Sequence, residues 1–254
     1  MDLALKDKRA VVTGASDGIG LEVCRGLVSE GVRVLGCARR PAPELGGLEY
    51  VQTDLTAEGA PAAVIEAAVE RLGGVDIVVN NVGAGRLRAG FTSMSDEDWL
   101  GSLDLNLMTA IRTMRAALPH LVDRGGVIVN IASVNATVPI VEGPDYSTSK
   151  AALLSAGRSV ALEYARSGVR VVTVSPGPVS TPFWLGPDGI AAQVEAATGT
   201  PAADVIAGTA ESVPLGRLLE PAEVADAVTF LASARAGAIT GTEVLIDGGY
   251  VQTM

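Results

Sequence analysis

Tyr146 and Lys150 stand four positions apart. On a helix this spacing places both side chains on one face. A phenol, with an ordinary pKa of about 10, exchanges protons poorly at neutral pH, whereas a neighbouring ammonium favours the phenolate and lowers that pKa. The pair therefore predicts acid–base chemistry. Taken alone, it is also typical of an ordinary helix whose lysine reaches out to solvent.

Two further polar side chains have positions that suit the same chemistry. Ser133 follows the apolar run 127–131, at the carboxyl edge where ligands bind in open α/β sheets, and its hydroxyl is suited to polarising a substrate carbonyl. Its alternative role is a hydrogen bond to the backbone of a turn. Asn106 lies inside the predicted helix 95–122, where asparagine is unfavourable, and its alternative role is to face solvent.

A glycine-rich turn occupies residues 13–20, Thr-Gly-Ala-Ser-Asp-Gly-Ile-Gly, between the first apolar run and the first predicted helix. This context is the one that a dinucleotide fingerprint requires. Glycines allow backbone amides to approach a pyrophosphate, which then faces the positive end of the helix. The alternative is a tight strand–helix turn that binds nothing.

The elements that must position these residues alternate along nearly the whole chain. Short β-branched runs predict strands at 10–13, 32–37, 48–52, 75–80, 127–131, 169–175 and 244–246. Helices are predicted at 18–30, 60–72, 95–122, 146–166 and 221–233. Because the strand runs are continuously apolar more than alternating, they favour a parallel sheet covered on both faces. We predict an α/β fold: a single Rossmann-type domain over 1–254, with a doubly wound, seven-stranded parallel sheet and helices on both faces.

Two connections depart from this alternation. Residues 38–47 are few and rich in proline and glycine, so we predict a loop or a single turn and a thinly covered flank of the sheet. Residues 177–217 contain five prolines and are predicted to form one long irregular insertion.

Composition argues against several other classes of protein. The 254 residues carry a net charge of −10, with two cysteines and one histidine. These counts disfavour a disulfide framework, the usual catalytic zinc sites and a nucleic-acid groove. No run of about 18 apolar residues is present, and the first nine residues do not resemble a signal peptide. We expect a cytoplasmic protein with no metal and no membrane or nucleic-acid partner.

Jointly, the motifs resemble the classical short-chain dehydrogenase/reductase family, and 3-oxoacyl-acyl-carrier-protein reductases in particular. The Gly-x-x-x-Gly-x-Gly spacing is similar to that family's, and so is Asn-Asn-Val-Gly at 80–83, where Val82 replaces the usual alanine. The segment Ser-Pro-Gly-Pro-Val at 175–179, with Thr181, resembles the family's segment after the sixth strand. The match spans roughly residues 6 to 250, and four positions fall in the family's catalytic order and spacing: Asn106, Ser133, Tyr146 and Lys150.

The resemblance implies a nicotinamide dinucleotide as cofactor. The positions that it assigns to the cofactor are Gly14, Ser16, Asp17, Gly18, Ile19, Gly20, Arg39, Arg40, Asp54, Leu55, Asn81, Gly83, Tyr146, Lys150, Pro176, Gly177, Val179 and Thr181. By this resemblance Asp54 bonds the adenine amino group, although its alternative role is to cap the following helix. Lys150 is implied to bond the nicotinamide ribose.

The end of the second strand bears on which nicotinamide is bound. An acidic residue there would bond a free ribose 2′-hydroxyl, but this chain has Ala38 followed by Arg39 and Arg40. Arginine suits a 2′-phosphate, so NADP(H) is favoured and NAD(H) stays possible. Asp17 counts against this preference, because related NADP-binding chains often carry a basic residue near that turn. The alternative role of both arginines is a solvated loop charge.

The resemblance also implies a reaction. Hydride passes between NADP(H) and a ketone or secondary alcohol, with reduction as the favoured direction. Tyr146 delivers the proton, Ser133 holds the substrate oxygen, and a water on Asn106 relays protons to Lys150. Residues 177–217 close over the substrate as a lid, which is expected to order on binding, and segments 84–91 and 134–145 line the rest of the pocket. A homotetramer is the expected assembly.

The substrate itself is less defined. Phe183 and Trp184 are either an apolar wall of the substrate site or side chains that pack the lid onto the core. We expect a small neutral carbonyl or alcohol substrate. Two other functions remain open: an NAD-dependent secondary-alcohol dehydrogenase, and a cofactor-sensing protein without catalysis.

Overall fold

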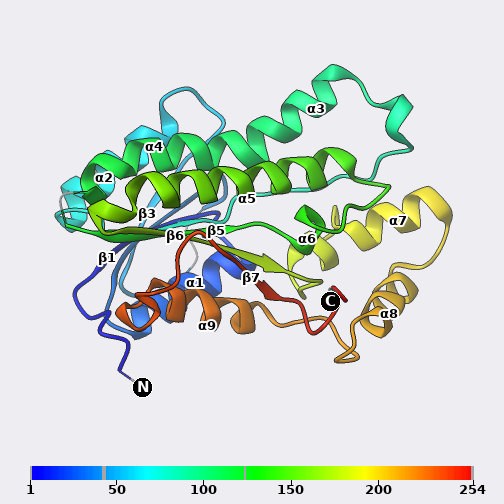
Figure 1. Cartoon of the computed structure of the whole chain (residues 1–254). Coiled ribbons are helices and arrows are strands. Elements are labelled where there is room, and N and C mark those ends of the chain that lie inside the picture. Colours follow the sequence, from blue (N-terminus) through cyan, green and yellow to red (C-terminus); the bar gives the residue numbers. More distant parts are fainter. Residues whose placement is uncertain (1, 42–43, 123, 253–254) are drawn as a thin grey trace.

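The computed structural model describes residues 2–41, 44–122 and 124–252, and its centre is one seven-stranded parallel sheet. The strands are β1 (Arg9–Thr13), β2 (Arg33–Ala38), β3 (Leu48–Gln52), β4 (Ile77–Asn80), β5 (Gly126–Ile131), β6 (Val169–Pro176) and β7 (Glu243–Ile246). Their order is β3-β2-β1-β4-β5-β6-β7 (Figure 1). The order reverses direction between β1 and β4, and such a switch point is where doubly wound sheets bind ligands. The predicted fold class is confirmed.

Helices cover both faces of this sheet. Helices α1 (Gly18–Ser29) and α9 (Pro221–Ala232) lie side by side on one face (Figure 1). Helices α2 (Ala60–Leu72), α4 (Thr109–Val122) and α5 (Pro144–Tyr164) cover the other. Short 3-10 turns occupy Phe91–Ser93, Val134–Ala136, Ala165–Ser167 and Ala234–Ala236.

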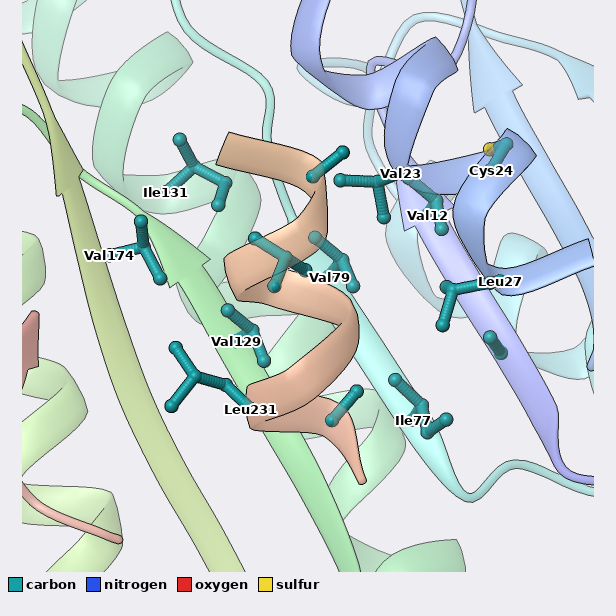
Figure 2. Packing of buried hydrophobic residues seen from close by; sticks show 14 of the residues in the cluster. Val12, Val23, Cys24, Leu27, Ile77, Val79, Val129, Ile131, Val174 and Leu231 are labelled. Atoms are coloured by element: carbon teal, nitrogen blue, oxygen red, sulfur yellow. The ribbon is translucent and has the colours of Figure 1, made fainter. Parts of the chain in front are cut away.

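The central strands are largely apolar because they contribute side chains to two cores. Val12, Val79 and Val129 point toward α1 and α9, where they meet Leu27 and Leu231 (Figure 2). The residues next to these along each strand, such as Val11 and Ile128, point to the other face of the sheet and are buried beneath α2 and α4. Since each of these side chains is buried, the sheet is a rigid base for the loops at its carboxyl edge.

The short connection after β2 behaves as predicted where the structure describes it. Residues 39–41 and 44–47 contain no helix, while positions 42 and 43 lie outside the described residues. Strand β3 pairs only with β2 and keeps Glu49 and Gln52 exposed. This flank of the sheet is therefore thinly covered.

The prediction of one continuous helix over 95–122 was wrong. The segment begins as α3 (Asp96–Leu103), capped by Ser95, passes through a π-helical turn at Asp104–Met108, and continues as α4. The wider turn lies around Asn106, whose amide bonds the Ser102 carbonyl at 3.1 Å. Competition by an asparagine side chain for a helix carbonyl is a physical reason for such an irregularity.

The prediction of an irregular insertion over 177–217 was also wrong in part. Three helices lie within it: α6 (Pro182–Leu185), α7 (Ile190–Thr198) and α8 (Ala202–Ser212). They extend beyond the carboxyl ends of the strands, at the side of the sheet where the chain also ends (Figure 1). The prolines fall at helix starts and between helices, where a missing amide costs nothing. Among the described residues, no helix is both long enough and apolar enough to cross a membrane.

Candidate active site

The glycine-rich turn joins β1 to α1 at the switch point of the sheet. Gly14 and Gly18 have φ angles of 66° and 52°, a conformation that favours glycine. A Cβ on Gly20 would lie 2.2 Å from the Gly14 carbonyl oxygen, so the first turn of α1 closes tightly onto the loop. Asp17 caps α1 without a side-chain hydrogen bond, which leaves the first amides of the helix open to an anion.

Asn81 holds this turn against the end of β4. Its amide donates to the carbonyl oxygens of Thr13 and Gly14, each at 3.2 Å. The Thr13 hydroxyl in turn accepts from the Asn81 backbone amide at 2.9 Å. The side chain predicted to contact the cofactor therefore fixes the loop that would hold the phosphates.

The end of β2 brings its two arginines to the far side of the same turn. Arg40 forms an ion pair with Asp17. Arg39 lies near Asp54, whose carboxylate accepts from the backbone and hydroxyl of Thr56 at 3.0 and 2.8 Å. These two bonds, helped by Arg39, hold the pKa of Asp54 below its ordinary value. Asp54 thus orders its own turn, six residues before α2 begins at Ala60.

Ser133, Tyr146 and Lys150 meet at the carboxyl edge of the sheet. Ser133 follows β5, while Tyr146 and Lys150 lie in the first two turns of α5. The Lys150 ammonium donates to the Ile131 carbonyl oxygen at 3.0 Å and lies 5.7 Å from the centre of the Tyr146 ring. All three side chains are buried. The alternative of a lysine that only reaches solvent is excluded.

Burial changes the proton affinities of the tyrosine and lysine. It raises the pKa of Tyr146 to about 12, with contact to the Ser133 hydroxyl acting in the opposite direction. Burial lowers the pKa of Lys150 to about 8. In the protein alone, the predicted lowering of the tyrosine pKa is therefore wrong, because loss of hydration is the dominant effect. At neutral pH Tyr146 therefore keeps its phenolic proton.

Asn106 is buried rather than facing solvent, with 1% of its surface exposed. Its carbonyl oxygen accepts from the Ala84 amide at 2.9 Å, and its amide donates to the Ala84 carbonyl at 3.0 Å. A Cβ on Gly83 would lie 3.2 Å from that Asn106 oxygen and 2.9 Å from the Lys150 nitrogen. Gly83 thus leaves open the space that both polar atoms border.

One cavity of about 640 Å³ joins the glycine-rich turn to these residues. All of the predicted catalytic, cofactor and substrate positions line it except Asn106 and Gly20, which lie just behind the lining. Segments 84–91 and 134–145 contribute to the wall through only part of their length, as at Arg86, Asn135 and Glu142. The cavity is thus one continuous site rather than two.

Tyr250 also lines the cavity, although it is not among the site residues predicted from the sequence. The Asp247 carboxylate accepts from the amides of Gly249 and Val251 at 3.0 and 2.8 Å and folds the chain end back over the site. Gly177 packs against the same turn, since a Cβ there would lie 2.9 Å from the Asp247 Cα. The signal was the Asp-Gly-Gly sequence after the last strand, which is typical of a tight turn.

Two aromatic side chains of α6 face the reactive end of the cavity. The rings of Phe183 and Tyr146 have centres 5.8 Å apart, and Trp184 lies edge-on to Phe183 at 6.5 Å. A Cβ on Gly85 would approach Phe183 to 3.2 Å. Phe183 lines the cavity and packs against Tyr146 and Gly85, a position that fits either of its two suggested roles.

Comparisons with known proteins identify the family of this chain. A family model described as enoyl-(acyl carrier protein) reductase matches residues 14–251. L-fucose dehydrogenase from Rattus norvegicus is 36% identical over 248 residues, covering 95% of this chain and 88% of that protein. 3beta-hydroxysteroid dehydrogenase 1 from Eggerthella lenta is 35% identical over 262 residues, covering 96% and 94%.

A solved structure is similar over the whole chain. L-sorbose reductase from Gluconobacter frateurii, complexed with NADPH and L-sorbose, superposes with a TM-score of 0.92 at 31% identity, covering 100% of both chains. The relatives are named dehydrogenases and reductases, enzymes that act on CH–OH and C=O groups. With its glycine-rich turn at the switch point and its Ser, Tyr and Lys at the sheet edge, this chain belongs to the short-chain dehydrogenase/reductase family of oxidoreductases.

Proposed function

We propose that this protein is an NADP(H)-dependent oxidoreductase that reduces a ketone to a secondary alcohol, with Tyr146 as the proton donor. One observation carries the proposal. Ser133, Tyr146 and Lys150 converge at one end of a cavity whose other end is the glycine-rich turn. A dinucleotide bound across the switch point would place its nicotinamide end beside these residues.

The residues present fit such a cofactor. The glycine-rich turn offers open helix amides, and Gly20 permits the close packing that a side chain would prevent. Gly83 leaves space beside the Lys150 ammonium, as a nicotinamide ribose would require. The other positions that the resemblance assigns to the cofactor are also proposed to hold it.

When bound, the nicotinamide supplies a hydride for the carbonyl carbon. In this scheme the Ser133 and Tyr146 hydroxyls hold the carbonyl oxygen, and Tyr146 gives it a proton. A tyrosine whose pKa is raised to about 12 carries that proton throughout the neutral range. The Lys150 ammonium, oriented by the Ile131 carbonyl, stabilises the phenolate that remains. In the reverse direction Tyr146 accepts the proton.

Asn106 has a supporting role in the proposal. Its two bonds to Ala84 fix the loop after β4 against the π-helical turn. Its oxygen and the Lys150 nitrogen border the space beside Gly83, where a water bonded to both would return protons to the lysine.

The preference for NADP(H) is supported by Arg39 and Arg40 on the cavity wall and by the NADPH in the L-sorbose reductase structure. Asp17 opposes it, because this carboxylate pairs with Arg40. Replacement Arg39→Ala should weaken NADPH binding and leave NADH binding unchanged. Unchanged NADPH binding would instead favour the second candidate, an NAD-dependent secondary-alcohol dehydrogenase on the same scaffold.

We propose that residues 177–217 form the lid of the substrate site within a single domain. Phe183 and Trp184 would provide an apolar wall beside Tyr146. The substrate would be a small neutral ketone or its alcohol. The related proteins named for L-fucose, a 3beta-hydroxysteroid and L-sorbose suggest that this family scaffold accepts chemically different carbonyl and alcohol compounds.

A homotetramer is part of the proposal. Three exposed leucines, Leu100 on α3, Leu162 on α5 and Leu245 on β7, lie on the elements through which the family resemblance implies pairing. Multi-angle light scattering should give about four times the chain mass of 25.8 kDa. A stable monomer would contradict the assembly and leave the proposed reaction untouched.

The function is tested first by binding and then by turnover. NADPH and NADH are titrated against tryptophan fluorescence, and a panel of ketones and alcohols is then screened for NAD(P)H-linked absorbance change. The proposal expects tighter binding of NADPH and reduction of at least one ketone. Binding without turnover across the panel would favour a cofactor-sensing protein instead.

A further inference from the structure

Arg88 joins three segments around the proposed site. It lies in the loop after β4, eight residues beyond Asn80, and its guanidinium reaches two carboxylates. The Nη2 and Nε atoms both donate to one oxygen of Asp145, at 2.5 and 3.1 Å. The Nη1 atom donates to Asp98 at 2.6 Å, in the first turn of α3. Its backbone amide donates to the Glu142 carbonyl at 2.9 Å.

Asp145 is the deeply buried member of this cluster. Its side chain is 3% exposed, against 16% for Arg88 and 36% for Asp98. It occupies the first turn of α5 and directly precedes Tyr146. Its second oxygen is buried without a hydrogen-bond partner among the described residues. Nearly all of the compensation for this buried charge therefore comes from Arg88.

A contribution to folding stability does not explain well why the Arg88–Asp145 ion pair is buried. Moving a carboxylate out of water costs several kcal/mol, and an ion pair that leaves one oxygen unbonded recovers that cost incompletely. Acidic residues do favour helix starts, but an exposed carboxylate would provide that interaction without burial. The ion pair does supply direction, because the planar guanidinium holds its partners at fixed angles.

The same loop also carries bonds to other parts of the site. Ala84 exchanges two hydrogen bonds with Asn106, and the Leu87 amide donates to Gln193 of α7 at 2.9 Å. Arg88 is the point at which this loop is attached to the start of α5. The Arg88 side chain thus ties the loop that borders the nicotinamide end to the helix turn that carries Tyr146, and its backbone amide ties the same loop to Glu142, two residues before α5 begins.

We propose that Arg88 is a positioning residue, which acts through Asp145 to fix the Tyr146 hydroxyl relative to the loop after β4. The inference rests on the proposed function for its effect on turnover, because it assumes that Tyr146 donates the proton. Proton and hydride transfer require reacting atoms within a few tenths of an ångström of their productive places, so a loosened α5 start slows chemistry more than it weakens binding.

The first test separates chemistry from binding in Asp145→Asn and Arg88→Met. Each should lower kcat about 10- to 100-fold. The Kd of NADPH, measured by fluorescence, should stay within about twofold of the wild-type value in both. Asp98→Asn is the matched control, since it removes the exposed partner of the same guanidinium, and it should change kcat by less than about twofold. A kcat near wild type in Asp145→Asn and Arg88→Met overturns the proposal.

A double variant distinguishes positioning from general stability. Apolar replacement of both partners in Arg88→Met/Asp145→Leu removes the unpaired buried charge and should recover the Tm lost in the single variants. The kcat should stay low, because the directional contact is still missing. Recovery of kcat together with Tm would show that the ion pair only stabilises the fold, and would overturn the proposal.

Hydrogen exchange tests the positioning without any turnover. The Ser147 amide donates to the Gly143 carbonyl at 3.0 Å and reports on the first turn of α5. Its exchange should accelerate at least about tenfold in Asp145→Asn and Arg88→Met, and not in Asp98→Asn. Unchanged exchange in the first two variants refutes the inference. If the wild-type protein shows no turnover, the proposed function fails, while this exchange experiment still decides whether Arg88 fixes the helix start.

Discussion

Arg40 at the end of β2 is ion-paired with Asp17 in the glycine-rich turn. Their side chains are 65% and 33% exposed, so the pair contributes little to folding stability. Its consequence lies in binding, because the arginine that suits a 2′-phosphate already holds a carboxylate. A phosphate at that place must compete with Asp17 for the guanidinium.

Replacement Asp17→Asn should therefore strengthen NADPH binding by about 3- to 10-fold, which corresponds to about 0.7–1.4 kcal/mol. NADH, which has no 2′-phosphate, should bind within about twofold of its wild-type affinity. Fluorescence titration at fixed ionic strength measures both. The control is Glu22→Gln, which removes the same charge from an α1 residue paired with Arg25 outside the cavity. Equal tightening of NADH, or none of NADPH, would contradict this role of Asp17.

Gly20→Ala tests the cofactor cradle. The new Cβ would lie 2.2 Å from the Gly14 carbonyl oxygen, so the turn must open and its amides must move. We expect the Kd of NADPH to rise at least about 30-fold, with the fold retained in circular dichroism. The control is Gly208→Ala in α8, where nothing lies within 4 Å and where alanine should stabilise the helix by about 0.5–1 kcal/mol. Undiminished NADPH binding in Gly20→Ala would place the cofactor elsewhere.

Lys150→Met should make the protein more stable at neutral pH while impairing catalysis. Burial lowers the folded-state pKa of Lys150 to about 8 from 10.5, so below pH 8 the folded state carries the full cost of the buried charge. Between pH 8 and 10.5 the unfolded chain binds the extra proton, so wild-type stability rises with pH. The variant should gain up to about 3 kcal/mol in the free energy of unfolding at pH 7.

That gain should disappear as the pH rises through 10.5, and denaturant melts at pH 7 and pH 11 measure both limits. Lys8→Met provides an exposed lysine as control and should show no such pH dependence. A destabilised Lys150→Met protein at pH 7 would mean that the bond to the Ile131 carbonyl outweighs the cost of burial.

Phe183→Ala probes the substrate end of the cavity. The ring lies beside Tyr146, so its loss should affect substrate binding more than cofactor binding. We expect the KM for a ketone substrate to rise about 10-fold, with the Kd of NADPH within about twofold. Trp184→Ala serves for comparison, since it tests whether both rings form the wall. An unchanged KM in Phe183→Ala would show that this ring only packs the lid.

Much of this fold and site was predictable from sequence because the signals were local. Apolar runs marked the buried strands, and the spacing of Tyr146 and Lys150 determined that both share one helix face. The π-helical turn at Asn106 was not predictable as an element, because it depends on bonds to Ser102 and to the distant Ala84. The same is true of Tyr250, which is brought to the cavity by a turn on Asp247.

The pKa shifts and ion pairs of the site were harder to predict from sequence than the residues that form it. The sequence placed an ammonium near a phenol, but the direction of the pKa shift follows from burial, which only the packed structure shows. Likewise, Arg40 and Asp17 are far apart in sequence, so their ion pair could not be foreseen from either motif alone. Charge pairing across loops depends on tertiary contacts rather than on local pattern.

The most direct test of the central claim is the rate of NADPH oxidation by a ketone substrate in wild type and Tyr146→Phe, measured at saturating NADPH. Phenylalanine keeps the ring against Phe183 and removes only the hydroxyl. We expect a kcat lower by at least about 1,000-fold, with the Kd of NADPH within about twofold of the wild-type value. A Tyr146→Phe protein that binds NADPH normally and still reduces the ketone at a rate within about tenfold of wild type would contradict the assignment of Tyr146 as proton donor.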